Sequence, residues 1–181
     1  MCRRFQKIND DERVITDPER SRERTMSRAV KLLAAKPRSI GELRERLLEK
    51  NWTNAEIVSR VLERLKEYSY LDDTKFASDL ALSKLRQKPQ GKRRLQQSLS
   101  KKKLSKEDVE TALVSAFEKM PETELIDAVI AKRLRLKGKP ENRDDTKKFY
   151  DHLMRQGFDF DLIRSKMSAV AKREIIDAEV E

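Results

Sequence analysis

The feature of this sequence that most constrains its fold is a pattern of apolar residues that occurs three times. In the first occurrence, the apolar positions are Leu43, Leu47, Trp52, Ile57 and Val61. The same spacing recurs 52 residues later and, after a further shift of 54 residues, a third time. The ten additional positions are Leu95, Leu99, Leu104, Val109, Leu113, Phe149, Leu153, Phe158, Ile163 and Met167. An internal repeat of this kind predicts a tandem array of similar structural units.

The spacing within each occurrence predicts two helices. Residues four apart, such as Leu43 and Leu47, lie on one face of an α-helix. The step of five between Leu47 and Trp52 breaks this period and predicts a tight turn. Few glycines and prolines (four and five) among many charged residues are also typical of helices. We find no run of alternating β-branched residues, so we expect no strands.

Candidate N-cap residues stand at equivalent positions of the three occurrences. Ser39 precedes Glu42 by three residues, as in a capping box, and Thr53 precedes Glu56 in the same way. Such side chains accept hydrogen bonds from the free N–H groups of the first helical turn. The expected caps are Ser39 and Thr53 in the first occurrence, Gly91 and Ser105 in the second, and Asp145 and Asp159 in the third.

A third helix is expected upstream of each pair, because a helical segment there ends at proline or glycine. These segments are RAVKLLAA before Pro37, TKFASDLALSKLRQ before Pro89, and ETELIDAVIAKRLRLK before Gly138. The predicted fold is all-α, with three tandem three-helix, helix-turn-helix-like repeats in an elongated, curved arrangement. The expected boundaries are 1–24 for a flexible or loosely helical N-terminal arm, 25–71, 72–120 and 121–172 for the repeats, and 173–181 for an acidic C-terminal tail.

Two adjacent carboxylates, Asp72 and Asp73, lie between the first two expected repeats. Neighbouring carboxylates hold a metal, act as acid and base, or start a helix. These two follow Tyr70 and Leu71 and precede the helix that contains Phe76, and carboxylates favour a helix N-terminus. A metal site needs more converging ligands than the sequence offers. We therefore expect Asp72 and Asp73 to be structural caps, and we expect no catalytic residue, metal site or cofactor.

Basic residues are concentrated in two segments. The formal net charge of +10 predicts an acidic partner, such as nucleic acid or an acidic protein surface. Residues 84–106 contain ten Lys or Arg and no Asp or Glu, and residues 132–139 read KRLRLKGK. With Leu95 and Leu99 facing the core, Arg93, Arg94 and Lys101 share the opposite helix face. Contacts with a partner or with phosphates are expected at Lys84, Arg86, Lys88, Lys92, Arg93, Arg94, Lys101, Lys102, Lys132, Arg133, Arg135 and Lys137.

The only cysteine, Cys2, and the only histidine, His152, do not indicate catalysis. Neither has a partner that would make it a nucleophile or a metal ligand, and His152 borders an apolar helix face. The first residues lack the apolar region of a signal peptide, and no apolar run is long enough to span a membrane. We therefore expect a cytoplasmic protein that binds no membrane.

Several of these segments resemble the RecX family. The resemblance covers roughly residues 27–171 and is carried by YLDDTKFA at 70–77, Ser39 with Glu42 and Leu43, QGKRRL at 90–95, and LMRQGFDFDLI at 153–163. It implies an all-helical regulator that binds the RecA recombinase filament on DNA. It also implies inhibition of ATP hydrolysis and strand exchange, and a part in homologous recombination, DNA repair and the SOS response.

The sequence departs from that family at turn positions where glycine is common. Ser69 replaces the glycine before the YLDD element, and the turns between second and third helices have Asn51, Lys103 and Gly157. Glycine adopts left-handed backbone readily and asparagine tolerates it, whereas lysine disfavours it. Lysine therefore leaves the conformation of the middle turn open, whereas the predicted fold does not depend on it.

Three classes of function are compatible with these features, and the features support them to different degrees. The first is a monomeric, non-enzymatic protein that binds the RecA filament, with weak and non-specific binding to single-stranded or duplex DNA. The second is a direct DNA-binding protein whose helix-turn-helix-like units contact phosphates. An enzyme is the third and least supported, because no catalytic constellation is present in the sequence.

Overall fold

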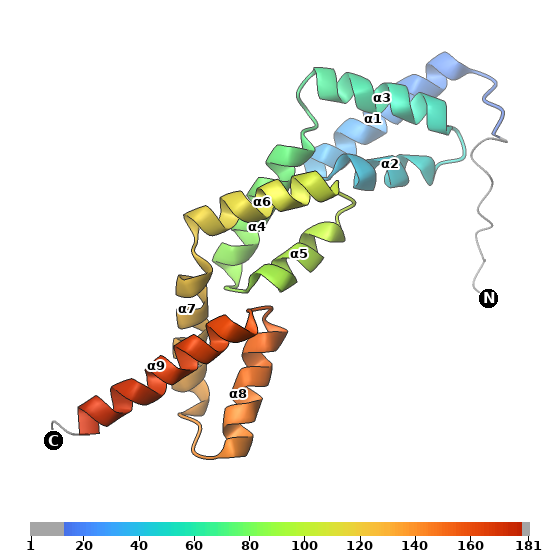
Figure 1. Cartoon of the computed structure of the whole chain (residues 1–181). Coiled ribbons are helices and arrows are strands. Elements are labelled where there is room, and N and C mark those ends of the chain that lie inside the picture. The colour runs from blue at the N-terminus through green and yellow to red at the C-terminus, as the bar shows by residue number, and fades with distance from the viewer. Residues whose placement is uncertain (1–12, 179–181) are drawn as a thin grey trace, which may run out of the picture. The chain divides into compact units, whose positions relative to one another are not determined.

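A computed structural model describes the backbone of residues 13–178 and the side-chain environment of residues 13–169. Within this range every regular element is an α-helix, which confirms the all-α prediction. The helices are α1 (Pro18–Ala35), α2 (Ile40–Leu48), α3 (Ala55–Glu67), α4 (Asp73–Gln87), α5 (Lys92–Ser100), α6 (Lys106–Lys119), α7 (Glu122–Lys137), α8 (Arg143–Arg155) and α9 (Phe160–Ala178) (Figure 1). Along the chain these helices form three successive groups of three: α1–α3, α4–α6 and α7–α9.

The repeated apolar pattern forms the core. Thirteen of its fifteen positions are buried, and the other two, Trp52 and Leu104, are half-buried. Both exceptions lie in the turn between the second and third helix of a repeat, whereas Phe158, at the equivalent position of the third occurrence, is fully buried. The indole ring of Trp52 is also covered by a cation, because the guanidinium of Arg24 lies 4.5 Å from the ring centroid.

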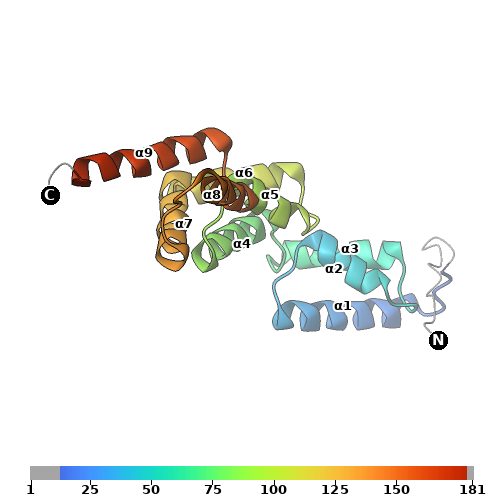
Figure 2. The same cartoon turned by 90° about the horizontal axis from the view of Figure 1, so that it is seen from below.

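The chain divides into two compact units. Unit 1 consists of Met1–Phe76 together with the turn residues Lys102–Leu104, and unit 2 consists of Ala77–Lys101 and Ser105–Glu181. In unit 1, α1 lies along both α2 and α3 (Figures 1 and 2). In unit 2, α5 packs against α6, and α9 packs against both α7 and α8.

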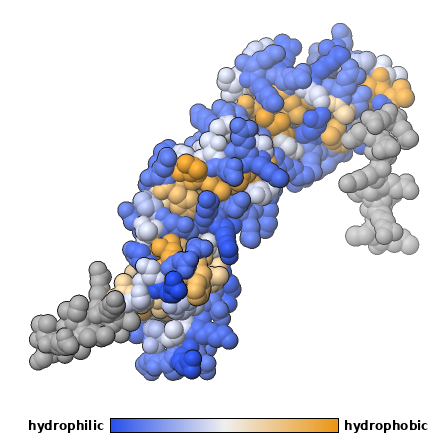
Figure 3. Space-filling view, viewed as in Figure 1, coloured by the Kyte–Doolittle hydropathy of each residue, from blue (hydrophilic) through white to orange (hydrophobic). Residues whose placement is uncertain are grey.

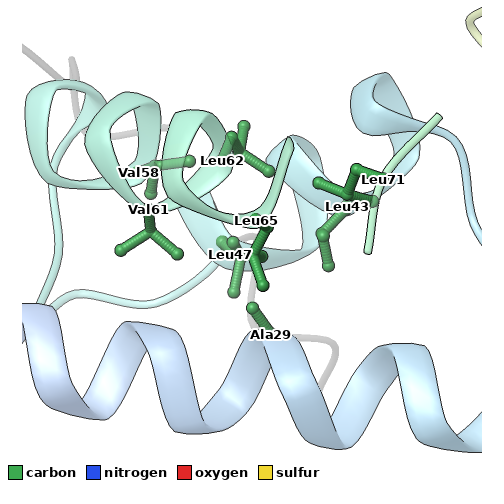
Figure 4. Close-up of a cluster of buried hydrophobic side chains, with 8 residues drawn as sticks. All are labelled: Ala29, Leu43, Leu47, Val58, Val61, Leu62, Leu65 and Leu71. Atoms are coloured by element: carbon green, nitrogen blue, oxygen red, sulfur yellow. The ribbon is translucent and has the colours of Figure 1, made fainter. Parts of the chain in front are cut away.

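The core of unit 1 brings one apolar face of each of its three helices together. Ala29 of α1 points toward Leu47 of α2 and Leu65 of α3, and the cluster is completed by Leu43, Val58, Val61, Leu62 and Leu71 (Figure 4). Beside this cluster the buried hydroxyls of Thr25 and Thr53 form a hydrogen bond of 3.1 Å. Burying each aliphatic side chain contributes roughly 1.5–3 kcal/mol, so this cluster dominates the stability of the unit.

Helix α1 begins within the segment that the sequence analysis assigned to an N-terminal arm. Asp17 caps it by accepting a hydrogen bond from the amide of Arg20 (3.0 Å), and Pro18 occupies the first turn. Arg13 then donates from Nη1 to the carbonyl oxygens of Leu48 and Lys50, both at 2.9 Å. The part of the expected arm from Pro18 onward is therefore the start of α1. Residues 1–12 of the expected arm, including Cys2, lie outside the described residues, as do residues 179–181 of the expected tail.

Two expected caps are displaced. The cap of α3 is Asn54 instead of Thr53, because the Thr53 hydroxyl is buried against Thr25 and the Asn54 side chain accepts from the amide of Ile57 (3.0 Å). The cap of α8 is Asn142 instead of Asp145. Its side chain accepts from the amide of Asp145 (2.9 Å), which therefore lies inside the first turn.

The other caps act at or beside their expected helix starts. Ser39 accepts from the amide of Glu42 (3.1 Å), and Ser105 accepts from the amide of Asp108 (2.9 Å). The carboxylate of Asp159 accepts from the amide of Asp161 (2.9 Å) at the start of α9, and Gly91 precedes α5 without a side-chain cap.

Candidate partner and phosphate interface

The Asp72–Asp73 pair caps two different helices. Asp72 caps α4, because its carboxylate accepts from the amide of Lys75 (2.8 Å). The carboxylate of Asp73 instead accepts from the amide of Ile40 (2.9 Å), at the start of α2. Asp73 therefore caps α2, a helix that precedes it in sequence. Among the described residues no group of three or more His, Cys, Asp or Glu could hold a metal ion.

Unit 2 contains the same arrangement at equivalent positions. Glu122, at the start of α7, accepts from the amide of Lys92 (2.9 Å), at the start of α5. Lys92 stands 52 residues after Ile40, the offset of the apolar repeat. The sequence analysis missed Glu122. Glu122 is the first residue of α7, just as Asp73 is the first residue of α4, so the role of Asp73 would have pointed to it.

A second contact joins the start of α5 to the turn between α8 and α9. The amide of Gly91 donates to the carbonyl of Gln156 (3.0 Å), and the amide of Arg93 donates to the carbonyl of Gly157 (3.2 Å). A Cβ atom on Gly91 would lie 2.3 Å from the carbonyl carbon and oxygen of Gly157, so only glycine fits. In unit 1 the Ser39 hydroxyl makes the matching contact by donating to the carbonyl of Lys102.

The turn before α6 and the turn before α9 each contain one residue with left-handed backbone, which is lysine in the first and glycine in the second. Gly157 has φ 91° and Lys103 has φ 56°, so the middle turn adopts left-handed backbone although its residue is lysine. The side chain of Lys103 ion-pairs with Glu45, and the neighbouring Lys102 pairs with Glu42 (2.7 Å). A left-handed conformation costs lysine about 1–2 kcal/mol.

The predicted cations differ in how available they are. Arg94 is half-buried and donates to the side chain of Gln156 (2.8 Å), so it does not share the exposed face of Arg93 and Lys101. Arg133 is also half-buried. Its guanidinium donates to the Lys148 carbonyl (3.3 Å) and lies 5.0 Å from the ring centroid of Phe149. Lys84 is half-buried, and the exposed cations are Arg86, Lys88, Lys92, Arg93, Lys101, Lys132, Arg135 and Lys137.

Charges from both basic segments act electrostatically on His152 of α8. The pKa of the half-buried imidazole is lowered, first by burial and then by the positive charges of Arg133, Arg155, Lys88 and Arg94. These residues come from α7, from α8, from the residue that follows α4, and from α5. The electrostatic environment of His152 is therefore set by its own helix together with α5, α7 and the residue that follows α4. Arg155 was missed in the sequence because it is a single basic residue between Met154 and Gln156.

The described surface contains a hollow in each unit. One, of about 900 Å³, lies between α1 and α3 of unit 1 and is bordered by the exposed rings of Tyr68 and Tyr70. The other, of about 550 Å³, lies beside the start of α8 and is lined by Asn142, Arg143 and Tyr150. The face shown in Figure 3 is mainly hydrophilic, with smaller apolar patches. No helix in the described range is long and apolar enough to cross a membrane.

The fold defines a protein of tandem three-helix repeats with exposed basic residues. Family models for the three domains of RecX match in order: the first three-helix domain at residues 26–65, the second at 72–113 and the third at 121–167. The chain belongs to the RecX family.

Individual relatives agree with this assignment. A protein named Regulatory protein RecX from Prosthecochloris aestuarii is 33% identical over 144 residues, which are 80% of this chain and 91% of that protein. A protein of the same name from Chlorobaculum tepidum is 30% identical over 150 residues, or 82% and 89% of the two chains. The crystal structure of RecX from Lactobacillus salivarius has the same fold, with a TM-score of 0.75 at 18% identity over 84% of this chain and 98% of that one.

Proposed function

We propose that this protein is a non-enzymatic regulator that binds the RecA recombinase filament on DNA and lowers its ATPase and strand-exchange activity. The observation that carries the proposal is the match of three consecutive repeats to the three RecX domain models. In this role the protein acts as a cytoplasmic monomer in recombination and in the response to DNA damage.

The exposed cations support binding to a filament that contains both protein and DNA. Arg86, Lys92, Arg93 and Lys101 are exposed in a stretch that contains no carboxylate. Solvated helix faces usually mix both signs of charge, so a face of one sign favours an anionic partner. Phosphates and acidic side chains of the recombinase both satisfy this requirement.

The variant Arg93→Glu tests the proposal without disturbing the fold. Arg93 is exposed, and only its backbone amide contacts the α8–α9 turn. Arg94 is left unchanged because its side chain binds Gln156. We expect Arg93→Glu to weaken inhibition of strand exchange and ATP hydrolysis, while Lys31→Glu, which makes the same charge change on α1, leaves it intact. If both variants inhibit equally, Arg93 does not contact the partner, and residues 132–137 become the candidate contact.

Direct binding of DNA is a second candidate function, which the ten Lys or Arg without a carboxylate at residues 84–106 favour. Capture of the purified protein by recombinase, with and without single-stranded DNA, separates the two functions. A filament regulator is captured by recombinase, more strongly on DNA. A protein that only binds DNA is captured by DNA alone and is not enriched by recombinase.

A further inference from the structure

We infer that the hollow between α1 and α3 of unit 1 is a docking groove for an amphipathic helix of the recombinase. Its apolar lining consists of Met26, Val30, Val61, Leu65, Tyr68 and Tyr70, and we call it the α1–α3 groove. The inference rests on the proposed function, because it takes the recombinase as the partner. It deepens that function by naming a surface that binds the protein part of the filament.

The α1–α3 groove gathers apolar side chains that the fold leaves in solvent. In the described part of the chain eight large hydrophobic side chains are exposed, and three of them, Val30, Tyr68 and Tyr70, border this groove. Single exposed apolar side chains are common on protein surfaces, whereas a group of them at a hollow is typical of a binding site. Tyrosine is also enriched among the residues that dominate binding at protein interfaces.

The end of α3 places both tyrosines at the edge of the groove. Tyr68 is the C-cap of α3, and Ser69 follows it with left-handed backbone (φ 58°). The amide of Tyr70 donates to the carbonyl of Leu65 (2.9 Å). The amide of Ser69 donates to the carbonyl of Lys66 (2.8 Å). These two bonds form a Schellman motif, which fixes the chain at the helix end and so lowers the entropic cost of ordering the two rings on binding.

The two walls of the groove carry charges of opposite sign. The charged residues that line it are Glu19, Arg22 and Glu23 on α1 and Arg60 and Arg64 on α3. Arg60 pairs with Glu56 of its own helix, and Arg64 donates to the hydroxyl of Tyr68 (3.2 Å). Among the described residues no salt bridge joins the two walls. A partner helix with basic residues toward α1 and acidic residues toward α3 complements both walls.

The length of the groove fits a helix. On α1 the lining residues Glu19, Arg22, Glu23, Met26 and Val30 recur at steps of three and four, so they form one continuous helix face. This face is about 17 Å long at a rise of 1.5 Å per residue. That length accommodates about three turns of a partner helix, whose apolar residues at i, i+3 or i+4 and i+7 reach the groove.

The chemistry of the groove favours a protein segment over nucleic acid. The carboxylates of Glu19 and Glu23 repel phosphates, and the buried side chains of Val61 and Leu65 offer only aliphatic carbon. An aliphatic or aromatic side chain of a partner loses unfavourable contact with water when it enters such a hollow. Unit 1 therefore recognises the protein of the filament through this groove.

The affinity of the full chain for purified recombinase without DNA tests the apolar contact. Val30→Asp places a charge in the groove and should weaken binding by about tenfold or more. Tyr70→Ala removes an exposed ring and should weaken binding by about tenfold. Val114→Asp is the matched control, because Val114 on α6 is similarly exposed (58% against 50% for Val30) and lies outside the groove. It should bind like the unaltered chain. Circular dichroism checks that every variant is folded.

Glu23→Lys tests the charge complementarity. It should weaken binding by about threefold at low salt and by less at high salt, because exposed ion pairs are weak and screened. Glu63→Lys, the same change at an exposed position of α3 outside the groove, should leave the affinity unchanged. Equal affinities of these two variants would refute the basic flank of the partner helix.

Cross-linking identifies the occupant of the groove. Tyr70→p-benzoylphenylalanine should cross-link to a helical segment of the recombinase under light, whereas Val114→p-benzoylphenylalanine should not. Cross-links from position 70 to a second copy of this chain or to DNA, and none to recombinase, would overturn the inference. Equal affinity of Val30→Asp and Val114→Asp for recombinase would overturn it as well.

Failure of this inference and failure of the proposed function give different results. If Val30→Asp and Tyr70→Ala bind recombinase and inhibit strand exchange as the unaltered chain does, the proposed function stands and the groove inference fails. If the unaltered chain does not bind recombinase, with or without DNA, the proposed function itself fails.

Discussion

The substitution Gly91→Ala should destabilise unit 2 through one crowded contact. Gly91 has φ −81°, which alanine adopts without strain, so the backbone conformation itself is not the obstacle. The obstacle is space, because the new Cβ would lie 2.3 Å from two backbone atoms of Gly157 and 2.4 Å from the amide nitrogen of Phe158. Ordinary contacts begin near 3.4 Å, so α5 and the α8–α9 turn must separate by about 1 Å.

The energetic cost follows from what this separation breaks. It lengthens the hydrogen bonds from Gly91 to Gln156 (3.0 Å) and from Arg93 to Gly157 (3.2 Å). Each bond contributes about 0.5–1.5 kcal/mol, and overpacking costs about 1–3 kcal/mol. We therefore expect Gly91→Ala to lower the free energy of unfolding by about 2–5 kcal/mol.

Urea unfolding followed by circular dichroism measures this loss. Gly138→Ala is the matched control, because Gly138 has φ 73° but no atom within 4 Å of the added Cβ. It isolates backbone strain and should cost about 1–3 kcal/mol, because φ 73° with ψ −178° is a conformation that essentially only glycine adopts. If Gly91→Ala costs less than about 1 kcal/mol, the contact between α5 and the α8–α9 turn does not stabilise unit 2, and the reasoning is wrong.

Three further predictions concern single residues. Asp73→Ala should accelerate hydrogen exchange of the Ile40 amide and cost about 1 kcal/mol in urea unfolding, whereas Asp72→Ala should cost a similar amount without changing that amide. Ser69→Gly should raise the free energy of unfolding by about 1 kcal/mol, because Ser69 has φ 58°; a loss of stability would contradict this. The pKa of His152 is lowered in the folded protein, so the unfolded chain binds more protons and stability should fall as pH drops through 6.5 and below. Urea unfolding between pH 7.5 and 5.5 should show this decrease, and His152→Asn should reduce it; equal decreases in both proteins would assign the effect to other groups.

The fold could be predicted from the sequence because its main determinants are local and repeated. Apolar residues at helical spacing determine which face of each helix is buried, and the threefold recurrence separates this signal from chance. Cap positions were less certain, since a shift of one residue at Thr53 follows from a tertiary hydrogen bond to Thr25. The caps were predicted by adding the repeat offsets of 52 and 54 residues, and such an offset carries no information about a tertiary hydrogen bond.

The candidate site was only partly predictable, because it depends on which helices meet. The basic segments were evident from charge alone. Sequence spacing, however, placed Arg94 on the same face as Arg93, although its side chain turns to Gln156. The cap by Glu122 and the bond of Arg94 to Gln156 depend on contacts between residues far apart in the chain. Helical periodicity does not contain that information.

The start of α5 has a consequence for synthesis on the ribosome. Its cap is Gly91, which offers no side chain, and its first amides bind Glu122, Gln156 and Gly157. Chains emerge from the N-terminus, at about 5–20 residues per second. The middle repeat therefore leaves the ribosome with its acceptors still untranslated, and it waits several seconds for them. A chaperone or protease that acts on the nascent chain meets this repeat in its least protected state.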